Sequence, residues 1–192
     1  MRNRRLLAVV IAVSLAAAGC AATRSDTATP AQSTPGTQRT SAAGTTGDLT
    51  GPSAPAQMIC SSEIRAAIKT AFALPTAPRS TQTWSNRIFR CTYDVAGAPL
   101  ALSVKDSPDQ RSGSAYFDAL RSQLSKGQPV QEFDSLGFPA FQTPDGKLAL
   151  IKDGKTLLVD TTGLPAASLP AGFARTDVAY AVATAVVTCW TE

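Results

Sequence analysis

The 192-residue sequence contains no histidine. Without imidazole the chain cannot form the Ser–His or Cys–His pairs that activate many nucleophiles, and it lacks the commonest general base near neutral pH. Imidazole metal sites are excluded for the same reason, and the four cysteines include no C-x-x-C pair suited to zinc or redox chemistry. We therefore expect no catalytic residues, no metal and no cofactor, so the chain is not expected to be an enzyme.

The N-terminus lacks a hydrophobic run long enough to cross a membrane. The thirteen residues Leu6–Ala18 carry no charge and follow three arginines, Arg2, Arg4 and Arg5, whereas a transmembrane helix needs roughly twenty apolar residues. A basic start, a short apolar centre and small residues before a cleavage point are typical of an export signal. We expect residues 1–19 to be a signal peptide that is removed from the mature protein.

The end of this run leads directly to a cysteine, and the residues read Leu15, Ala16, Ala17, Ala18, Gly19, Cys20. They resemble the bacterial lipobox, in which the cysteine is joined to diacylglycerol and the peptide is cleaved just before it. Two or three acyl chains hold a protein to a membrane far more firmly than one. The resemblance implies a lipid on Cys20, with the mature chain at the extracytoplasmic face of the cell membrane.

The chain has almost no net charge once the signal peptide is removed. The whole chain has 18 basic and 14 acidic residues, and three basic ones leave with the signal, so 15 remain against 14. A net charge near +1 favours neither nucleic acid nor an anionic partner. We expect no nucleic acid among the partners.

Residues 20–57 have few large apolar side chains. Of the 37 residues from Ala21 to Gln57, 29 are Thr, Ala, Ser, Pro or Gly, and Leu49 is the one large aliphatic residue. Such a segment cannot bury enough apolar area to offset the entropy of ordering its backbone. We expect a disordered tether with a reach on the order of 30 to 35 Å, followed by a single globular domain at residues 58–192.

Helical and strand patterns alternate within residues 58–192. Helical periodicity occurs in three places, and period-two alternation or Asp-Gly turns mark five strands. The expected helices begin at Ser61, near Ser112 or Ser114, and at Thr176 or Asp177, and the expected strands are Phe89–Val95, Leu100–Val104, Phe138–Thr143, Lys147–Ile151 and Thr156–Asp160. This order predicts an α+β two-layer sandwich, with about five mostly antiparallel strands and about three helices packed on one face.

Three cysteines, Cys60, Cys91 and Cys189, remain when Cys20 is set apart. An odd number in an oxidising compartment predicts one disulfide and one buried free thiol. We prefer a bridge between Cys60 and Cys91, which would join the first helix to the first strand. A bridge between Cys60 and Cys189 stays open, because spacing alone does not determine connectivity.

Several short motifs run through the folded part: Met58–Ser61, Glu63–Ile64, Thr83–Trp84, Phe89–Tyr93, Leu102–Lys105, Leu158–Asp160 and Cys189–Thr191. Together they resemble small actinobacterial secreted lipoproteins of an uncharacterised domain family. The resemblance implies a lipobox, a Ser/Thr/Pro stalk and a cysteine-stapled domain, and it implies no reaction. The third cysteine departs from the two-cysteine pattern of that family.

Three groups of residues are candidates for a site, although each also has a simple structural explanation. The groups are the turns Asp145-Gly146-Lys147 and Asp153-Gly154-Lys155, the loop residues Lys105, Asp106 and Asp109, and the aromatic residues Trp84, Tyr93 and Trp190. Asp-Gly suits a tight hairpin turn, charged residues after a strand suit a solvated loop, and scarce aromatic residues suit a core. We expect the structural roles to hold.

Three functions stay open. The first is a non-catalytic binding or interaction module of the cell envelope, whose partner is an envelope protein or a wall or lipid component; an exposed apolar or aromatic patch on the sheet face away from the helices would mark it. The alternative is a carrier of a small hydrophobic ligand or lipid, with a cavity of several hundred Å³ between sheet and helices. The third is an envelope hydrolase that uses carboxylates or a Ser-Lys pair.

Overall fold

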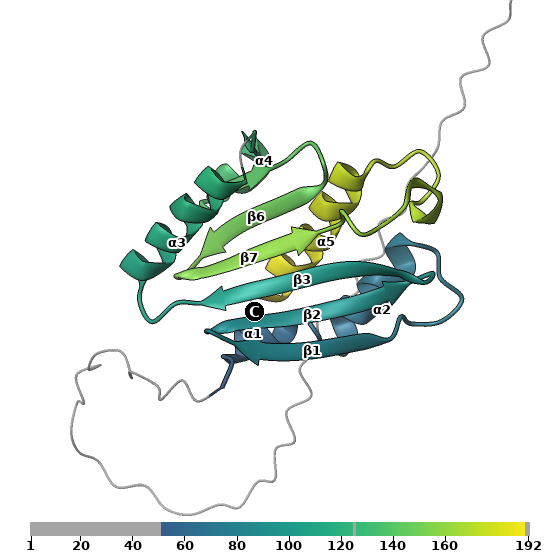
Figure 1. Cartoon of the computed structure of the whole chain (residues 1–192), viewed down its shortest axis with the longest axis horizontal. Coiled ribbons are helices and arrows are strands. Elements are labelled where there is room, and N and C mark those ends of the chain that lie inside the picture. Colours follow the sequence, from purple (N-terminus) through teal and green to yellow (C-terminus); the bar gives the residue numbers. More distant parts are fainter. Residues whose placement is uncertain (1–50, 125, 191–192) are drawn as a thin grey trace, which may run out of the picture. The chain divides into compact units, whose positions relative to one another are not determined.

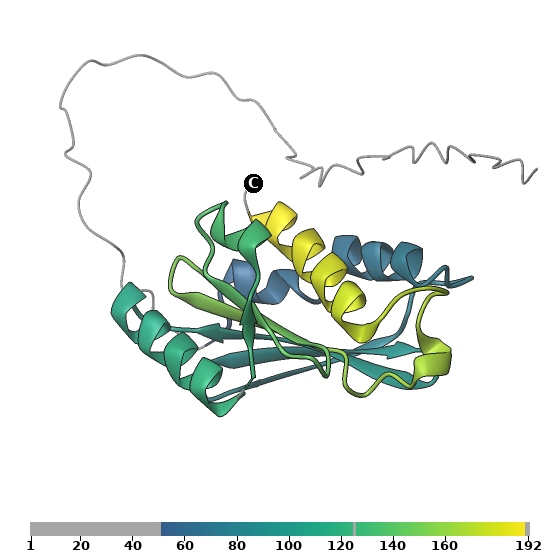
Figure 2. The same cartoon turned by 90° about the horizontal axis from the view of Figure 1, so that it is seen from above.

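The computed structural model describes residues 51–124 and 126–190. They form a seven-stranded antiparallel sheet with helices on both faces (Figures 1 and 2). The expected signal peptide, Cys20 and most of the expected tether lie outside the described residues. Within the described part, no helix is long and apolar enough to cross a membrane. The fold class is α+β, as the sequence predicts.

The sheet has the strand order β1-β2-β3-β7-β6-β5-β4. In chain order the elements are α1 (Ala54–Met58), α2 (Ser62–Ala71), β1 (Ser80–Ser85), β2 (Ile88–Val95), β3 (Ala98–Asp106), α3 (Gln110–Gln123), β4 (Gln128–Pro129), α4 (Gln131–Asp134), β5 (Ala140–Gln142), β6 (Lys147–Lys152), β7 (Lys155–Asp160), the 3₁₀ turn η1 (Ala166–Ser168) and α5 (Arg175–Trp190).

Two-residue turns make three of the hairpins of this sheet, β1–β2, β2–β3 and β6–β7. Both turn residues have positive φ in Asn86–Arg87, Ala96–Gly97 and Asp153–Gly154, which is the conformation that matches the twist of paired strands. The first turn has no glycine, and β3 holds it in place. Arg87 Nε donates to the carbonyl of Asp106 at 2.9 Å, and the Arg87 carbonyl accepts from the Asp106 N–H at 2.8 Å.

One face of the sheet carries the main core. Alternate residues of β3, namely Leu100, Leu102 and Val104, are fully buried on this face. The face is covered by α1, α2 and α5 (Figure 2), and Val182 and Val186 are among the buried residues of α5. The alternation expected for β2 and β3 is therefore confirmed.

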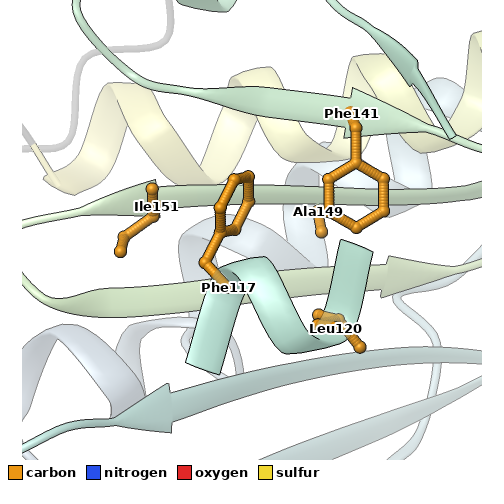
Figure 3. Packing of buried hydrophobic residues seen from close by; sticks show 5 residues of the cluster. All are labelled: Phe117, Leu120, Phe141, Ala149 and Ile151. Atoms are coloured by element: carbon orange, nitrogen blue, oxygen red, sulfur yellow. The ribbon is translucent and has the colours of Figure 1, made fainter. Parts of the chain in front are cut away.

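Helix α3 packs on the opposite face, over β6 and β7. Phe117 and Leu120 of α3 lie against Phe141, Ala149 and Ile151 (Figure 3), and the rings of Phe117 and Phe141 have their centroids 5.3 Å apart. Since neighbouring strand residues point to opposite faces, the unbroken buried run in β6 also requires cover on both sides. The expectation that the helices lie on one face is wrong for α3.

The start of α3 is fixed by a cap and by a close contact. Asp109 Oδ1 accepts from the N–H of Ser112 at 2.8 Å, so the helix begins slightly before the expected Ser112 or Ser114. A Cβ added to Gly113 would stand 2.5 Å from the carbonyl oxygen of Gly154. This glycine therefore lets α3 approach the β6–β7 turn.

Seven strands are present where five were expected. The two additional strands are β1, with half-buried or exposed side chains throughout, and the two-residue β4. Helix α1 was also unexpected, because residues 54–57 have the composition of the tether. Ala56 is nevertheless fully buried, and the side chain of Ser53 accepts from its N–H at 3.4 Å. The folded domain thus includes residues upstream of residue 58, the expected domain boundary.

The Cys60–Cys91 disulfide is present, as preferred from the sequence. It joins the segment between α1 and α2 to the centre of β2, across 31 residues of sequence. None of the described cysteines is a free thiol, so the expectation of one free thiol is wrong. The alternative bridge from Cys60 to Cys189 is likewise excluded, because Cys60 is bonded to Cys91.

Tyr93 lies beside this disulfide on β2 and is fully buried. Its hydroxyl donates to the carbonyl oxygen of Ile59 at 2.7 Å, and thereby joins α1 to the sheet. Burial raises the pKa of Tyr93 to about 12, although the nearby Arg65 opposes the shift.

We predict that Tyr93 makes the domain sensitive to alkaline pH. The pKa of Tyr93 in the folded domain, about 12, exceeds the ordinary value of 10.0. The neutral hydroxyl therefore stabilises the folded state fully below pH 10, and this stabilisation is lost as the pH rises toward 12. Tyr93→Phe removes the hydrogen bond to Ile59, at a cost of about 1 to 2 kcal/mol at neutral pH. The difference in unfolding free energy between the two proteins should narrow from pH 9 to pH 12 in urea titrations. Parallel pH profiles would contradict the assignment.

The close contact at Gly113 gives a second prediction. Alanine favours an α-helix by about 1 kcal/mol over glycine, yet Gly113→Ala should lower the unfolding free energy, because overpacking against Gly154 costs about 1 to 3 kcal/mol. The exposed neighbour is the control: Ser114→Ala should leave stability unchanged or raise it slightly. Urea unfolding measures both, and a Gly113→Ala protein more stable than the original would refute the contact.

Candidate binding site

The first described residues are fastened at one end of the sheet. The N–H of Ser53 donates to Asp106 Oδ2 at 2.8 Å, and Asp106 is the buried last residue of β3. The indole N–H of Trp190 donates to the Pro55 carbonyl at 2.8 Å, which joins α1 to the end of α5. Asp106 also forms an ion pair of 3.7 Å with Lys155. The chain therefore enters the domain where β3 ends.

A groove of about 660 Å³ lies near the other end of the sheet. One of its lining residues, Thr143, donates its N–H to the carbonyl of Lys147 at the start of β6. Lys147 is paired with Asp160 of β7, which is paired with Ala101 near the start of β3. Ala101 and Asp106 are five residues apart along β3, which corresponds to roughly 17 Å, so the groove is separated from Ser53 and Asp106.

Segments from four parts of the chain form the groove: β4, α4, the end of β5, and the start of α5 with the loop before it. Its described lining residues are Gln128, Pro129, Val130, Glu132, Gln142, Thr143, Pro144, Phe173, Thr176, Asp177, Tyr180 and Ala181. Figure 1 shows α4 and the start of α5 on either side of the end of the sheet that carries β6.

Two aromatic rings give the groove its apolar surface. Phe173 is 52% exposed, which is unusual for a large apolar side chain in this compact domain. Tyr180 is half-buried, and its ring stacks in a tilted arrangement on the buried ring of Phe133, with centroids 5.2 Å apart. Packing on Phe133 thus holds the tyrosine ring in place, while about half of the phenylalanine is exposed to solvent.

Polar bonds hold the walls of the groove together. Gln142 Nε2, at the end of β5, donates to the carbonyl of Thr176 at 2.6 Å and so connects the sheet to the first turn of α5. Asp177 Oδ2 accepts from the N–H of Ala174 at 2.7 Å. Glu132 and Asp177 are exposed carboxylates, and none of the described lining residues is a lysine or arginine. The groove is therefore negative in character.

Two further hollows lie beside the β2–β3 turn. One has a volume of about 390 Å³ and the other about 450 Å³, and Arg79, Asp94 and Gly97 line both. Asp94 Oδ1 accepts from the Gly97 N–H at 2.8 Å, which is a turn bond. No large exposed apolar side chain marks these two hollows, whereas Phe173 marks the groove.

The residues that we considered as sites from the sequence have structural roles. Asp145-Gly146-Lys147 and Asp153-Gly154-Lys155 form the β5–β6 and β6–β7 turns, with an ion pair between Lys147 and Asp145 at 2.6 Å. Lys105 Nζ donates to the Asn86 carbonyl at 2.7 Å, Asp106 is buried, and Asp109 caps α3. Trp84 is half-buried in β1, and Tyr93 and Trp190 bond to Ile59 and Pro55. None of them lines the groove.

The lowered pKa values of three carboxyl groups have local causes. The backbone N–H of Glu63 lowers its own carboxyl pKa, and the side chains of Ser61 and Ser62 add to this. The N–H of Ser112 lowers the pKa of Asp109, and the Lys147 ammonium lowers that of Asp145. These shifts therefore mark two helix starts and a hairpin turn.

The sheet face away from α1, α2 and α5 is polar where α3 leaves it uncovered. Thr83, Arg90 and Ser103 are neighbours across β1, β2 and β3 on this face. At its border Lys105 Nζ lies 5.4 Å from the centre of the Tyr116 ring, and burial raises the pKa of Tyr116 while Arg90 opposes the shift. The large apolar side chains that are exposed among the described residues are Leu136 and Phe173, so the described part of this face does not carry the expected apolar or aromatic patch.

Sequence reasoning missed Phe173 and Tyr180. Phe173 follows Pro170 and Gly172, so an aromatic residue in a turn-rich loop was the one available signal. Tyr180 lies outside the apolar stripe of α5, and its position beside β5 follows only from the tertiary structure. Among the described residues, no group of three or more histidine, cysteine, aspartate or glutamate side chains is placed to hold a metal ion.

No family model, curated protein or solved structure matches this chain.

Proposed function

We propose that this chain is a membrane-anchored lipoprotein of the extracytoplasmic face, and that its domain is a non-catalytic binding or interaction module of the cell envelope. The lipobox-like residues before Cys20 support this location at the membrane. The observation that carries the binding role is the separation of the two ends of the domain. The chain enters beside Ser53 and Asp106, while the groove with the exposed Phe173 lies near the far end of the sheet.

This arrangement suits a tethered receptor. A partner that occupies the groove does not compete with the segment that joins the domain to its tether, because none of the first described residues and none of the residues of β3 lines the groove. The groove is also open and mixed in polarity, with aromatic, amide and carboxylate groups. Pockets that bind small molecules commonly have volumes of 300 to 1,000 Å³, and protein surfaces with an exposed aromatic anchor commonly bind other proteins.

The space between the helices favours this function over a lipid carrier. The cavity between α2 and α5, lined by residues such as Ile64, Ile68 and Val182, has a volume of about 20 Å³. A space of this size holds about one water molecule, whereas a carrier needs several hundred Å³. The binding proposal therefore rests on the surface groove.

The lipid anchor gives a prediction of its own. The full-length protein should partition with membranes, and its N-terminal peptide should have the mass of an acylated Cys20. Cys20→Ser should move the protein to the soluble fraction, because the acyl chains supply the membrane affinity. Ser114→Ala, at an exposed position, is the control and should stay with the membrane. Because Cys189 is not a free thiol in the described structure, the peptide mass also decides whether Cys20 carries acyl chains or a disulfide. Recovery of Cys20 in a disulfide, or membrane retention of Cys20→Ser, would contradict the anchor.

The groove is tested by photo-crosslinking in cells. A photoreactive phenylalanine analogue in place of Phe173 should give a discrete product with an envelope component, because this side chain stands at the groove. The same analogue in place of Leu136 is the matched control, since Leu136 is 64% exposed and does not line the groove. Similar products at both positions, or none at position 173, would contradict a docking role for the groove.

A further inference from the structure

We infer that the groove recognises a cationic side chain, so that its ligand is a peptide segment of a partner protein that presents arginine or lysine. This inference rests on the proposed function and adds the chemical class of the ligand. It combines two features that are independent of each other. The groove has two accessible aromatic rings, Phe173 and Tyr180, and two exposed carboxylates, Glu132 and Asp177, with no lysine or arginine among its described lining residues.

The carboxylates have no cation of their own. The ion pairs of the described residues are Lys147–Asp145, Lys152–Asp153 and Lys155–Asp106, and none involves the groove. Asp177 uses one oxygen to accept from the Ala174 N–H, and its position in the first turn of α5 partly offsets its charge. Glu132 has no such bond and is the freer of the two carboxylates. A guanidinium or ammonium group supplies the missing opposite charge.

The aromatic rings fit the same ligand. A cation over the face of an aromatic ring is attracted by the ring quadrupole, and arginine does this most often. Phe173 is accessible for such a contact because it is 52% exposed. Tyr180 is fixed by its packing on Phe133, and the Gln142–Thr176 bond fixes the adjacent wall. The groove is thus largely formed before a ligand enters, which lowers the entropic cost of binding.

The edge of the sheet favours recognition of side chains over addition of a strand. Strand β4 has only two residues, and its second residue, Pro129, has no N–H to donate to an incoming backbone. Pro144 also lines the groove and limits backbone pairing in the same way. A peptide therefore binds through contacts of its side chains with the aromatic rings and the carboxylates, and not through its backbone.

Anionic ligands are disfavoured by the two carboxylates. An uncharged sugar can pack on the rings and form a hydrogen bond with Gln142, but it does not neutralise the charges of Glu132 and Asp177. The cationic peptide uses both kinds of group at once, and for this reason we choose it over a glycan. A neutral oligosaccharide then serves as a probe in the test.

The test uses the full-length chain purified in detergent and three labelled pentapeptides that differ only in the central residue: arginine, citrulline or glutamate. Citrulline has the shape of arginine without its charge. Fluorescence anisotropy should show the arginine peptide binding about tenfold more tightly than the citrulline peptide, and the glutamate peptide binding most weakly. Raising the salt concentration should weaken only the arginine peptide, because its advantage is electrostatic.

Variants assign the effect to the groove. Glu132→Gln and Phe173→Ala should each weaken the arginine peptide about threefold to tenfold, as expected for one ion pair or one cation–π contact. Leu136→Ala and Asp153→Asn are matched exposed controls outside the groove and should bind as the original does. Circular dichroism verifies that each variant is folded.

Three outcomes would overturn the inference: equal binding of the arginine and citrulline peptides, no binding of any peptide, or arginine binding that Phe173→Ala and Glu132→Gln leave unchanged. Tighter binding of a neutral oligosaccharide, lost in Phe173→Ala, would also overturn the cationic class while leaving the groove as the docking site. The mass of the Cys20 peptide and the crosslink at position 173 are separate measurements. A failure of this inference is therefore distinguishable from a failure of the proposed function.

Discussion

The domain depends on the burial of β6 on both of its faces. Leu148–Ile151 is an unbroken buried run, so alternate residues need cover from opposite directions. Helix α5 supplies it on one side and α3 on the other, and both helices pack on β6 and β7. In the described part of the chain, no helix lies over β1 and β2 on the α3 side (Figure 1), and the neighbouring residues Thr83, Arg90 and Ser103 on this face are polar. A single sheet thus has a three-layer half and a two-layer half.

Much of this fold could be predicted from the sequence, because most elements carry a local signal. The apolar stripe of α2, the alternation of β2 and β3, and the Asp-Gly turns depend on residues close together in the chain. Strand β1 has no such signal, since it forms an edge and its side chains are half-buried or exposed throughout. Helix α1 is short and alanine-rich, and what distinguishes it from a tether is its distant contacts with Asp106 and Trp190. The side of the sheet on which α3 packs also depends on tertiary contacts.

The groove could not be predicted in the same way. Its residues come from four separate segments, and none of them forms a motif of fixed spacing. Phe173 and Tyr180 are seven residues apart, and Glu132 reaches the same surface only because α4 lies beside the edge of the sheet. Conversely, the residues with a local pattern, such as Asp145-Gly146-Lys147, are explained by the turns that the pattern forms. In this domain the short sequence motifs indicate how the chain folds locally. The candidate site forms only when helices and strands from distant parts of the sequence pack together.

The fastening of α1 has a mechanical consequence for a domain that is pulled by its N-terminal segment. Force applied at Gly51 passes first into the Ser53–Asp106 bond and, through α1, into the Trp190–Pro55 bond. From there it is shared by β3, which is an interior strand of the sheet, and by α5, which is the longest helix described. The groove shares part of this path, because Thr176, Asp177 and Tyr180 of α5 line it. Glu132 and Phe173 line the groove from outside α5. A pull on the N-terminal segment therefore reaches the α5 wall of the groove only after it has loaded the two hydrogen bonds at Ser53 and Pro55.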